Sequence, residues 1–397
     1  MMPEALYIVL LMLLLVLVWI VGHSVGARGS RKVYGGTILQ QPSEGIRFLL
    51  NEQPDQAIDS FIRAVDVTPS TLETHLALGT LMRRRGEVDR AIKVHQNLLS
   101  RTSLNQQQIC QARLELGLDF HKAGLLDRAE RLFLELTENP KGDFRQESLH
   151  HLVEIYRDEQ EWDKAIRASR QLNTKLLARG SDSHLIEQAN FYCELALQNI
   201  DNGDSFEARR HLMSALKLNK SSARANIIWG DLERKISNPS EALIHYLQVP
   251  TQQPELLPEI LGRVGDCYDE LHDQEGKLKQ FRRWMAVHPS VNLTLAVVQI
   301  IRNECGEEEA SRFLSESLEA TPSIKGLSSL LDIHIDRTQG ELSDRLALIQ
   351  NVLKRVTSRQ VSHRCSKCGF KANQLHWFCP QCKCWETIKP FQGDEGA

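Results

Sequence analysis

The amino-acid sequence predicts an all-α solenoid of stacked helix pairs, with a hydrophobic segment at its amino end and a small cysteine knuckle at its carboxyl end. Three observations predict this organisation: a small residue that recurs about every 34 positions, a charge-free stretch near residue 1, and five of the nine cysteines within the last 33 residues. Hydrophobic residues make up 42% of the chain and charged residues 25%, which is typical of a folded protein. The net charge of −3 creates no global attraction to nucleic acid.

The amino-terminal segment is predicted to cross a membrane. From Ala5 to Gly22, 18 residues carry no charge, and as a helix they would span about 27 Å, enough for the hydrocarbon core of a bilayer. A buried core helix or a cleaved signal peptide are the alternatives, but a signal peptide normally begins with basic residues and here only Glu4 precedes the stretch. We therefore expect an anchor at residues 1–22 and a glycine-containing flexible linker at 23–42. The basic residues that place the rest of the chain in the cytoplasm follow the span: Arg28, Arg31 and Lys32.

Residues 43–356 show an internal repeat. A small residue occupies the same point in the second helix of each expected pair, and the spacings are 34, 38, 36, 43, 34, 34 and 34 residues. This period is typical of a tetratricopeptide array, in which helix pairs stack because no pair can bury its apolar face alone. A non-repetitive helical bundle is the alternative, which the three successive intervals of 34 disfavour. The positions are Ala57, Ala91, Ala129, Ala165, Ala208, Ala242, Gly276 and Ala310.

The supporting positions of the repeat indicate how the helices pack. Twelve residues before the small residue, a glycine allows close approach of the first helix, as at Gly79, Gly117 and Gly230. The segment Leu342–Val356 is expected to be a helix that caps the array. No glycine-rich phosphate loop or catalytic motif stands out, so we predict a protein that is not an enzyme and whose concave groove binds peptides or helices of other proteins.

The carboxyl-terminal region, 357–397, contains a metal-binding motif. Two C-x₂-C pairs separated by ten residues place four thiolates around one ion, and the spacing fits both zinc and rubredoxin-type iron. Gly369 supplies the permissive backbone of the first turn, and Trp377, Phe378 and Trp385 are expected to shield the site. Cys384 is left over, while His363 and His376 are near enough to be alternative ligands. The predicted ligands are Cys365, Cys368, Cys379 and Cys382.

The order of these three parts, together with the stretch CSKCGF…WFCPQCKCW…TIKP from Cys365 to Pro390, resembles the lipopolysaccharide assembly protein B family of Gram-negative bacteria. The resemblance covers essentially the whole chain. It implies a rubredoxin-like knuckle that packs against the repeats, with Cys365, Cys368, Cys379 and Cys382 as ligands of iron, or of zinc as the alternative. It also implies a single-pass inner-membrane adaptor with its body in the cytoplasm, which binds the membrane-anchored FtsH-type protease and other membrane proteins of the pathway. This adaptor would promote turnover of the LpxC deacetylase and so limit lipopolysaccharide synthesis.

Two features of the knuckle depart from a true rubredoxin. The spacer between the cysteine pairs is short, and Lys383 stands where glycine is common, which favours a structural metal over electron transfer. An iron–thiolate redox protein nevertheless stays an alternative to the adaptor. A nucleic-acid binder is a weaker one, because the region from Arg364 to Ala397 carries only five basic and three acidic residues. The sequence leaves room for a homo-oligomer.

Overall fold

The computed structural model describes residues 72–100, 104–140, 142–172, 181–337, 341–357 and 362–390. Over these ranges the chain consists of successive α-helices followed by a small antiparallel sheet, so the predicted helical array with a carboxyl-terminal knuckle is confirmed. The predicted membrane span, the linker and Ala57 lie outside the described residues. Within the described ranges, no helix is both long and apolar enough to cross a bilayer.

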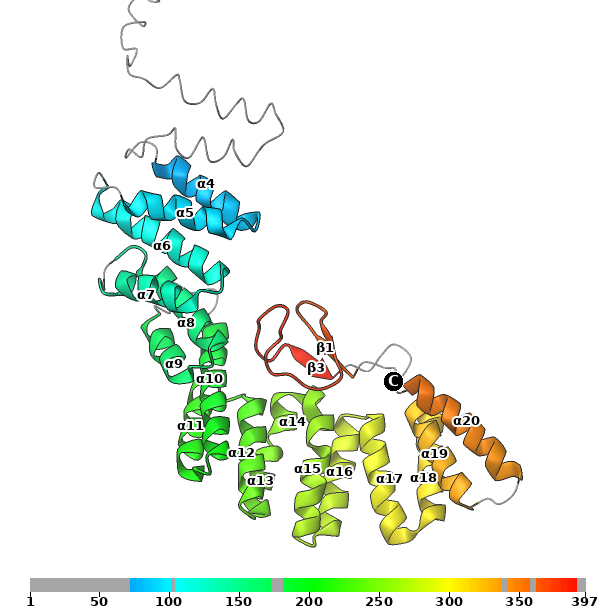
Figure 1. The fold of residues 1–397 in the computed structure, drawn as a ribbon. Helices are drawn as coiled ribbons and strands as arrows, with labels where there is room; N and C mark the ends of the chain where they lie inside the picture. Colours follow the sequence, from blue (N-terminus) through cyan, green and yellow to red (C-terminus); the bar gives the residue numbers. More distant parts are fainter. Residues whose placement is uncertain are drawn as a thin grey trace, which may run out of the picture. The chain divides into compact units, whose positions relative to one another are not determined.

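The chain forms two compact units, residues 1–132 and 133–397. The described part of the first unit begins with three helices that pack on one another, and α7 starts in this unit and ends in the second (Figure 1). These helices are α4 (Leu72–Arg84), α5 (Val88–Leu99), α6 (Gln106–Lys122) and α7 (Leu126–Thr137).

Within the second unit, helices that follow one another along the chain lie side by side (Figure 1). Its last helix, α20, packs against α19. The helices are α8 (Arg145–Asp158), α9 (Trp162–Gln171), α10 (Ser181–Asp201), α11 (Ser205–Leu218), α12 (Ala223–Lys235), α13 (Pro239–Tyr246), α14 (Val249–Gln252), η1 (Pro254–Leu256), α15 (Leu257–Glu270), α16 (Gln274–Val287), α17 (Val291–Cys305), α18 (Glu307–Ala320), α19 (Ile324–Arg337) and α20 (Glu341–Thr357).

The alanines of the predicted repeat lie where paired helices cross, whereas Gly276 is half-buried in the first turn of α16, where a Cβ atom would overlap Asp273. The alanines at these positions in the described chain have no exposed surface: Ala91, Ala129, Ala165, Ala208, Ala242 and Ala310. Four residues after the alanine, a large side chain covers the glycine of the first helix. A Cβ atom on Gly79 would overlap the ring of His95, and one on Gly230 would overlap the ring of Tyr246. The 34-residue period therefore arises from one repeated helix contact.

Helix ends in the second unit follow from local side-chain chemistry. Ser222 accepts a hydrogen bond from the backbone N–H of Ala225 at the start of α12, and Ser290 does the same for α17 through Leu293. Gly203, after α10, has a φ of 81°, which lets the chain turn into the next helix. These signals set the length of each helix, so the pairs stack in a regular series.

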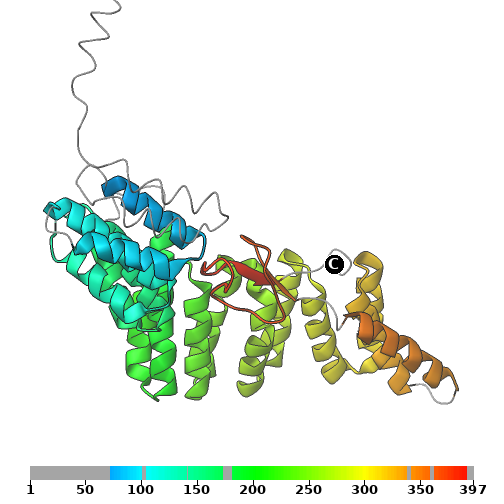
Figure 2. The same ribbon diagram turned by 45° about the horizontal axis from the view of Figure 1, so that its top comes forward.

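The last described segment, residues 362–390, is a knuckle built on three short strands. They are β1 (His363–Cys365), β2 (Lys371–Ala372) and β3 (Ile388–Pro390), in the antiparallel order β2-β1-β3, with Cys365 opposite Ile388. The knuckle lies beside α12 to α15 (Figures 1 and 2). It is therefore placed against the repeats of its own unit.

Candidate metal centre and its contact with the repeats

Four cysteine sulfurs converge in the knuckle. The Sγ atoms of Cys365, Cys368, Cys379 and Cys382 all lie within 4.8 Å of one another. The Sγ atoms of Cys365 and Cys382 are 3.7 Å apart, and those of Cys368 and Cys379 are 3.6 Å apart. A zinc–sulfur bond of about 2.3 Å gives tetrahedron edges of about 3.8 Å. The four thiols therefore have the chemistry and the spacing of a tetrahedral site, which suits zinc or iron alike.

Hydrogen bonds prepare the first cysteine for metal binding. Burial raises the pKa of the Cys365 thiol, but hydrogen bonds with Thr387 and from the backbone N–H groups of Cys368 and Lys367 outweigh burial and lower the pKa to about 6. The Sγ of Cys365 lies 3.3 Å from Oγ1 of Thr387. A lowered pKa favours the thiolate, which is the form that binds metal.

The two cysteine loops share one backbone geometry. In each, the residue after the second cysteine donates its N–H to the carbonyl of the first: Gly369 to Cys365 at 3.0 Å and Lys383 to Cys379 at 2.9 Å. Both residues take left-handed backbone angles, with φ of 78° and 53°. Glycine adopts this conformation freely, whereas a residue with a side chain does not. Lys383 is therefore held at a position that costs conformational energy.

Two strained residues use their side chains to contact the repeats. Nζ of Lys383 lies 2.9 Å from Oδ2 of Asp158, at the end of α8. Glu386 also has a positive φ, 58°, and its carboxylate accepts a hydrogen bond of 2.9 Å from Nδ2 of Asn190 on α10. A longer bond of 3.4 Å comes from Nε2 of Gln253. The second loop thus attaches the metal site to the array.

Aromatic rings form the centre of this contact. The ring of Trp385 lies 6.5 Å from that of Trp162 on α9 and 6.1 Å from that of Phe191 on α10, both edge to face. The guanidinium of Arg224, on α12, lies 5.2 Å from the ring of Trp385 and 5.7 Å from that of Trp377. Such contacts contribute more when they are removed from water. The sequence assigned Trp377 and Trp385 to shielding the metal, whereas the structure gives both rings contacts with the repeats.

Arg224 is itself fixed by polar partners on α10. Its guanidinium donates to Oδ1 of Asn190 at 2.9 Å and to Oε1 of Glu194 at 2.6 Å, and the residue is only 3% exposed. Asn190 therefore bridges Arg224 and Glu386 with the two ends of its amide. The network pairs both terminal nitrogens of a buried arginine that lies against two indole rings, whereas its Nε has no hydrogen-bond partner among the described residues.

The edge of the knuckle adds contacts to η1 and α15. Nζ of Lys389 on β3 lies 2.6 Å from Oε1 of Gln253 and 3.1 Å from Oε1 of Glu255. His363 lies 3.1 Å, through Nε2, from Oε1 of Glu259. His363 thus faces α15, and neither it nor His376 belongs to the sulfur cluster of the described chain.

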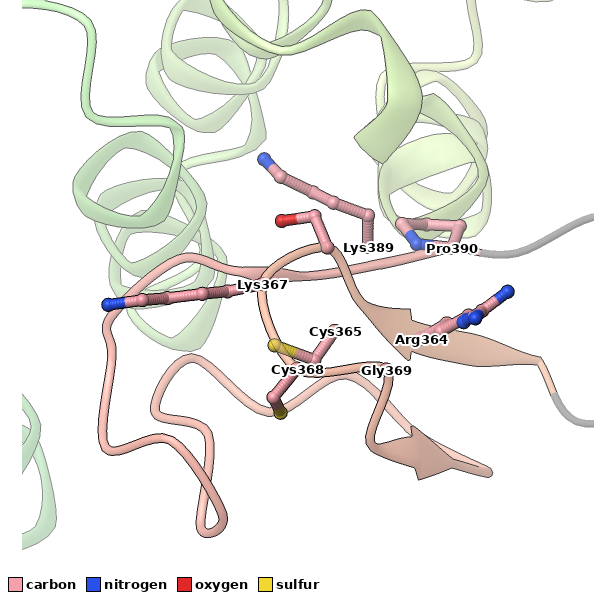
Figure 3. Close-up of a pocket in the computed structure, with 8 residues that line it drawn as sticks. Arg364, Cys365, Lys367, Cys368, Gly369, Lys389 and Pro390 are labelled. Carbon is pink, nitrogen blue, oxygen red and sulfur yellow. The ribbon is translucent and has the colours of Figure 1, made fainter.

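An open pocket of about 540 Å³ lies over the first loop and is lined by residues 364–369, Lys389 and Pro390. Figure 3 shows that its basic side chains, Arg364, Lys367 and Lys389, point in different directions. Lys389 is engaged by Gln253 and Glu255, and Nζ of Lys367 lies 2.9 Å from Sγ of Cys384. These cations do not converge on one point, so the pocket offers no anion site. Cys384, the odd thiol, faces Lys367.

Comparison with known proteins agrees with this construction. Residues 363–390 match the family described as "Rubredoxin metal binding domain", and residues 74–108 match "Tetratricopeptide repeat". A protein of Escherichia coli (strain K12), "Lipopolysaccharide assembly protein B", is 35% identical over 353 residues, which cover 89% of each chain. The chain belongs to the lipopolysaccharide assembly protein B family. The Haemophilus influenzae protein of that name is 29% identical and covers 97% of this chain and 99% of its own. A tetratricopeptide repeat protein from Parabacteroides merdae aligns at 15% identity and a TM-score of 0.33, over 66% of this chain and 98% of its own.

In this member of the lipopolysaccharide assembly protein B family, the residues that contact the knuckle escaped prediction from sequence. Asn190, Arg224 and Gln253 resemble ordinary polar residues of helix surfaces or turns, and each meets the knuckle across more than a hundred residues of chain. Lys383 carried the one usable signal, because it replaces the glycine that the loop geometry favours. Trp162 is buried in the core of the repeats and makes an edge-to-face contact with Trp385.

Proposed function

We propose that this protein is a non-enzymatic adaptor in lipopolysaccharide assembly, and that it brings the LpxC deacetylase to a membrane-anchored FtsH-type protease. The relatives named lipopolysaccharide assembly protein B support the pathway. The charge-free segment from Ala5 to Gly22 supports an anchor in the inner membrane, with the body in the cytoplasm. Tethering to the plane of the protease raises the effective concentration of both partners, so weak contacts suffice for regulation.

One observation carries this proposal: the second cysteine loop, which supplies two of the four metal ligands, also makes the contacts with the repeats. Cys382, Lys383, Trp385 and Glu386 follow one another within five residues, and the last three contact α8, α9, α10 or α12. Metal-binding energy becomes folding energy when no site exists in the unfolded chain. The ion, when bound, would therefore stabilise one arrangement of α8, α9, α10 and α12.

The Cys₄ site fits a structural role better than electron transfer. Lys383 has a strained, left-handed backbone conformation in the second loop, and its side chain forms an ion pair with Asp158 of the repeats. The redox alternative makes a different prediction: the regulatory activity should require iron and should depend on the reduction potential of the iron centre. Protein loaded with zinc in place of iron, with full regulatory activity and no visible absorption, would eliminate it.

The adaptor proposal is tested by removing two ligands in the full-length protein in cells. Cys365→Ser with Cys368→Ser is expected to abolish metal binding and to lengthen the half-life of LpxC toward that of cells lacking the protein. The measurements are the metal content of the purified protein and the decay of LpxC after translation is stopped. Cys110→Ser with Cys305→Ser is the matched control, because neither thiol belongs to the four-sulfur cluster. Normal LpxC decay in the first variant, with its metal lost, would refute the role of the knuckle.

A further inference from the structure

The repeats present a built binding site to the knuckle. Its polar side chains are Asn190 on α10 and Arg224 on α12, which are 1% and 3% exposed. Its aromatic side chains are Trp162 on α9 and Phe191 on α10, which are 7% and 0% exposed. Polar groups buried this deeply need hydrogen-bond partners, because an unpaired polar group away from water is costly. The four residues therefore form a surface that selects the chemistry of its occupant.

The centre of this site is filled by two residues of the knuckle that are neighbours in the sequence. The ring of Trp385 lies edge to face against the rings of Trp162 and Phe191. The carboxylate of Glu386 accepts a hydrogen bond of 2.9 Å from Nδ2 of Asn190. The site thus recognises an aromatic residue that is followed directly by an acidic one. Repeat arrays bind segments of other proteins through side chains on their helices, so the same site suits a segment of another chain.

The docked knuckle is an imperfect occupant of this site. Lys383 and Glu386, which flank Trp385 in the loop, both have left-handed backbone conformations, and these cost conformational energy in any residue with a side chain. Nε1 of Trp385 and Nε of Arg224 are buried without a hydrogen-bond partner in the described chain, so each loses its hydration without compensation. The knuckle stays docked because it belongs to the same chain, which gives it a high effective concentration. A segment without these penalties can therefore compete with it.

We propose that the site is shared by two occupants. Trp385 and Glu386 occupy it from within the chain, and a partner protein occupies it with an aromatic residue followed by aspartate or glutamate. The two occupants exclude each other, so docking of the knuckle releases the partner. The inference rests on the proposed function, since an adaptor must both bind its client and release it. A variant whose knuckle cannot fold is then expected to retain the partner, which also accounts for the expected loss of regulation.

The first test measures binding of a labelled peptide to the full-length protein in detergent by fluorescence anisotropy. The probe is a synthetic peptide with the sequence of residues 383–389 and the change Cys384→Ser. In the protein, Trp385→Ala with Glu386→Ala empties the site, so this variant is expected to bind the probe at least about tenfold more tightly than wild-type protein does. The control peptide carries Trp385→Ala and Glu386→Gln, and both proteins should bind it equally weakly.

The second test shows whether the probe binds at the proposed site. In the emptied variant, Asn190→Ala is expected to weaken binding of the probe by about five- to tenfold, because it removes the hydrogen bond to the carboxylate. Asn199→Ala is the matched control on the same helix, since its amide bonds the backbone carbonyl of Leu195. Circular dichroism and metal content check that each variant folds. The proposal is overturned by a probe that binds the emptied variant no better than the wild type, or by binding that Asn190→Ala leaves unchanged.

The metal-ligand variant separates this inference from the proposed function. Cys365→Ser with Cys368→Ser is expected to bind the probe about as tightly as the emptied variant does, because its knuckle no longer folds onto the site. If the probe binds in this way and LpxC still decays normally, the shared site stands and the role of the knuckle in regulation fails. If LpxC decay stops and the probe does not bind, the shared site fails and the adaptor role stands.

Discussion

The two cysteine loops of the knuckle have nearly the same backbone conformation, but only the second uses its side chains to contact the repeats in the described chain. The loop from Cys365 to Gly369 lines an open pocket and places glycine at its left-handed position. The loop from Cys379 to Glu386 places Lys383 and Glu386 in left-handed conformations and uses both side chains on the repeats. The first loop therefore serves the metal site alone. The second loop has two strained residues, and the side chains of both bind the repeats.

The largest expected effect on docking of the knuckle against the repeats comes from replacing the Trp385 ring, which lies at the centre of that contact. Trp385→Ala is expected to weaken docking of the knuckle by about 3 kcal/mol, because the indole contacts Trp162, Phe191 and Arg224. Hydrogen–deuterium exchange would show faster exchange in α10 and α12, while the metal content stays unchanged.

The matched variant in the first half of the knuckle is Phe370→Ala. Phe370 packs against the cysteine cluster and makes no described contact with the repeats. With metal saturating, it is expected to leave exchange in α10 unchanged and to speed loss of the ion to a chelator. If both variants produced the same exchange pattern, the division of duties between the two loops would be wrong.

The sequence was sufficient for the repeated contacts and for the cysteine cluster because both are local patterns. Ala91, Ala165 and Ala242 mark the same helix crossing at a nearly constant spacing, and each C-x₂-C pair lies within one turn. The docking surface depends instead on pairs that are far apart, such as Asn190 with Glu386, 196 residues away. A polar residue on a helix carries no sign of a distant partner. The only local sign of the contact was the lysine at position 383, where the left-handed backbone favours glycine.

A smaller effect is expected from the hydrogen bond between Asn190 and Glu386. A double-mutant cycle with Asn190→Ala and Glu386→Ala isolates their coupling, which we expect to be about 1 kcal/mol in favour of docking. The stability of each variant against urea, followed through exchange of the knuckle, supplies the four free energies. The control cycle pairs Asn190→Ala with Ser366→Ala, since Ser366 bonds only Thr387 within the described chain. A control coupling as large as the first would mean that the effect spreads through the fold and does not report one contact.

The last comparison replaces the residues at the two left-handed positions, and here the signs of the two stability changes are informative. Gly369→Ala has room for its Cβ, whose nearest neighbour would be the Arg364 side chain at 3.7 Å, so the cost of about 1 to 2 kcal/mol is conformational alone. Lys383→Gly gains about that much and loses an ion pair with Asp158 that is largely open to solvent, which contributes between about 0 and 1 kcal/mol. Thermal unfolding of the metal-loaded protein should therefore show Gly369→Ala destabilised and Lys383→Gly unchanged or slightly stabilised. The same ion pair joins the knuckle to the end of α8, so exchange at the end of α8 should be faster in Lys383→Gly even where the melting temperature is not lower. Slow exchange there in Lys383→Gly would show that the aromatic contact alone fixes the orientation.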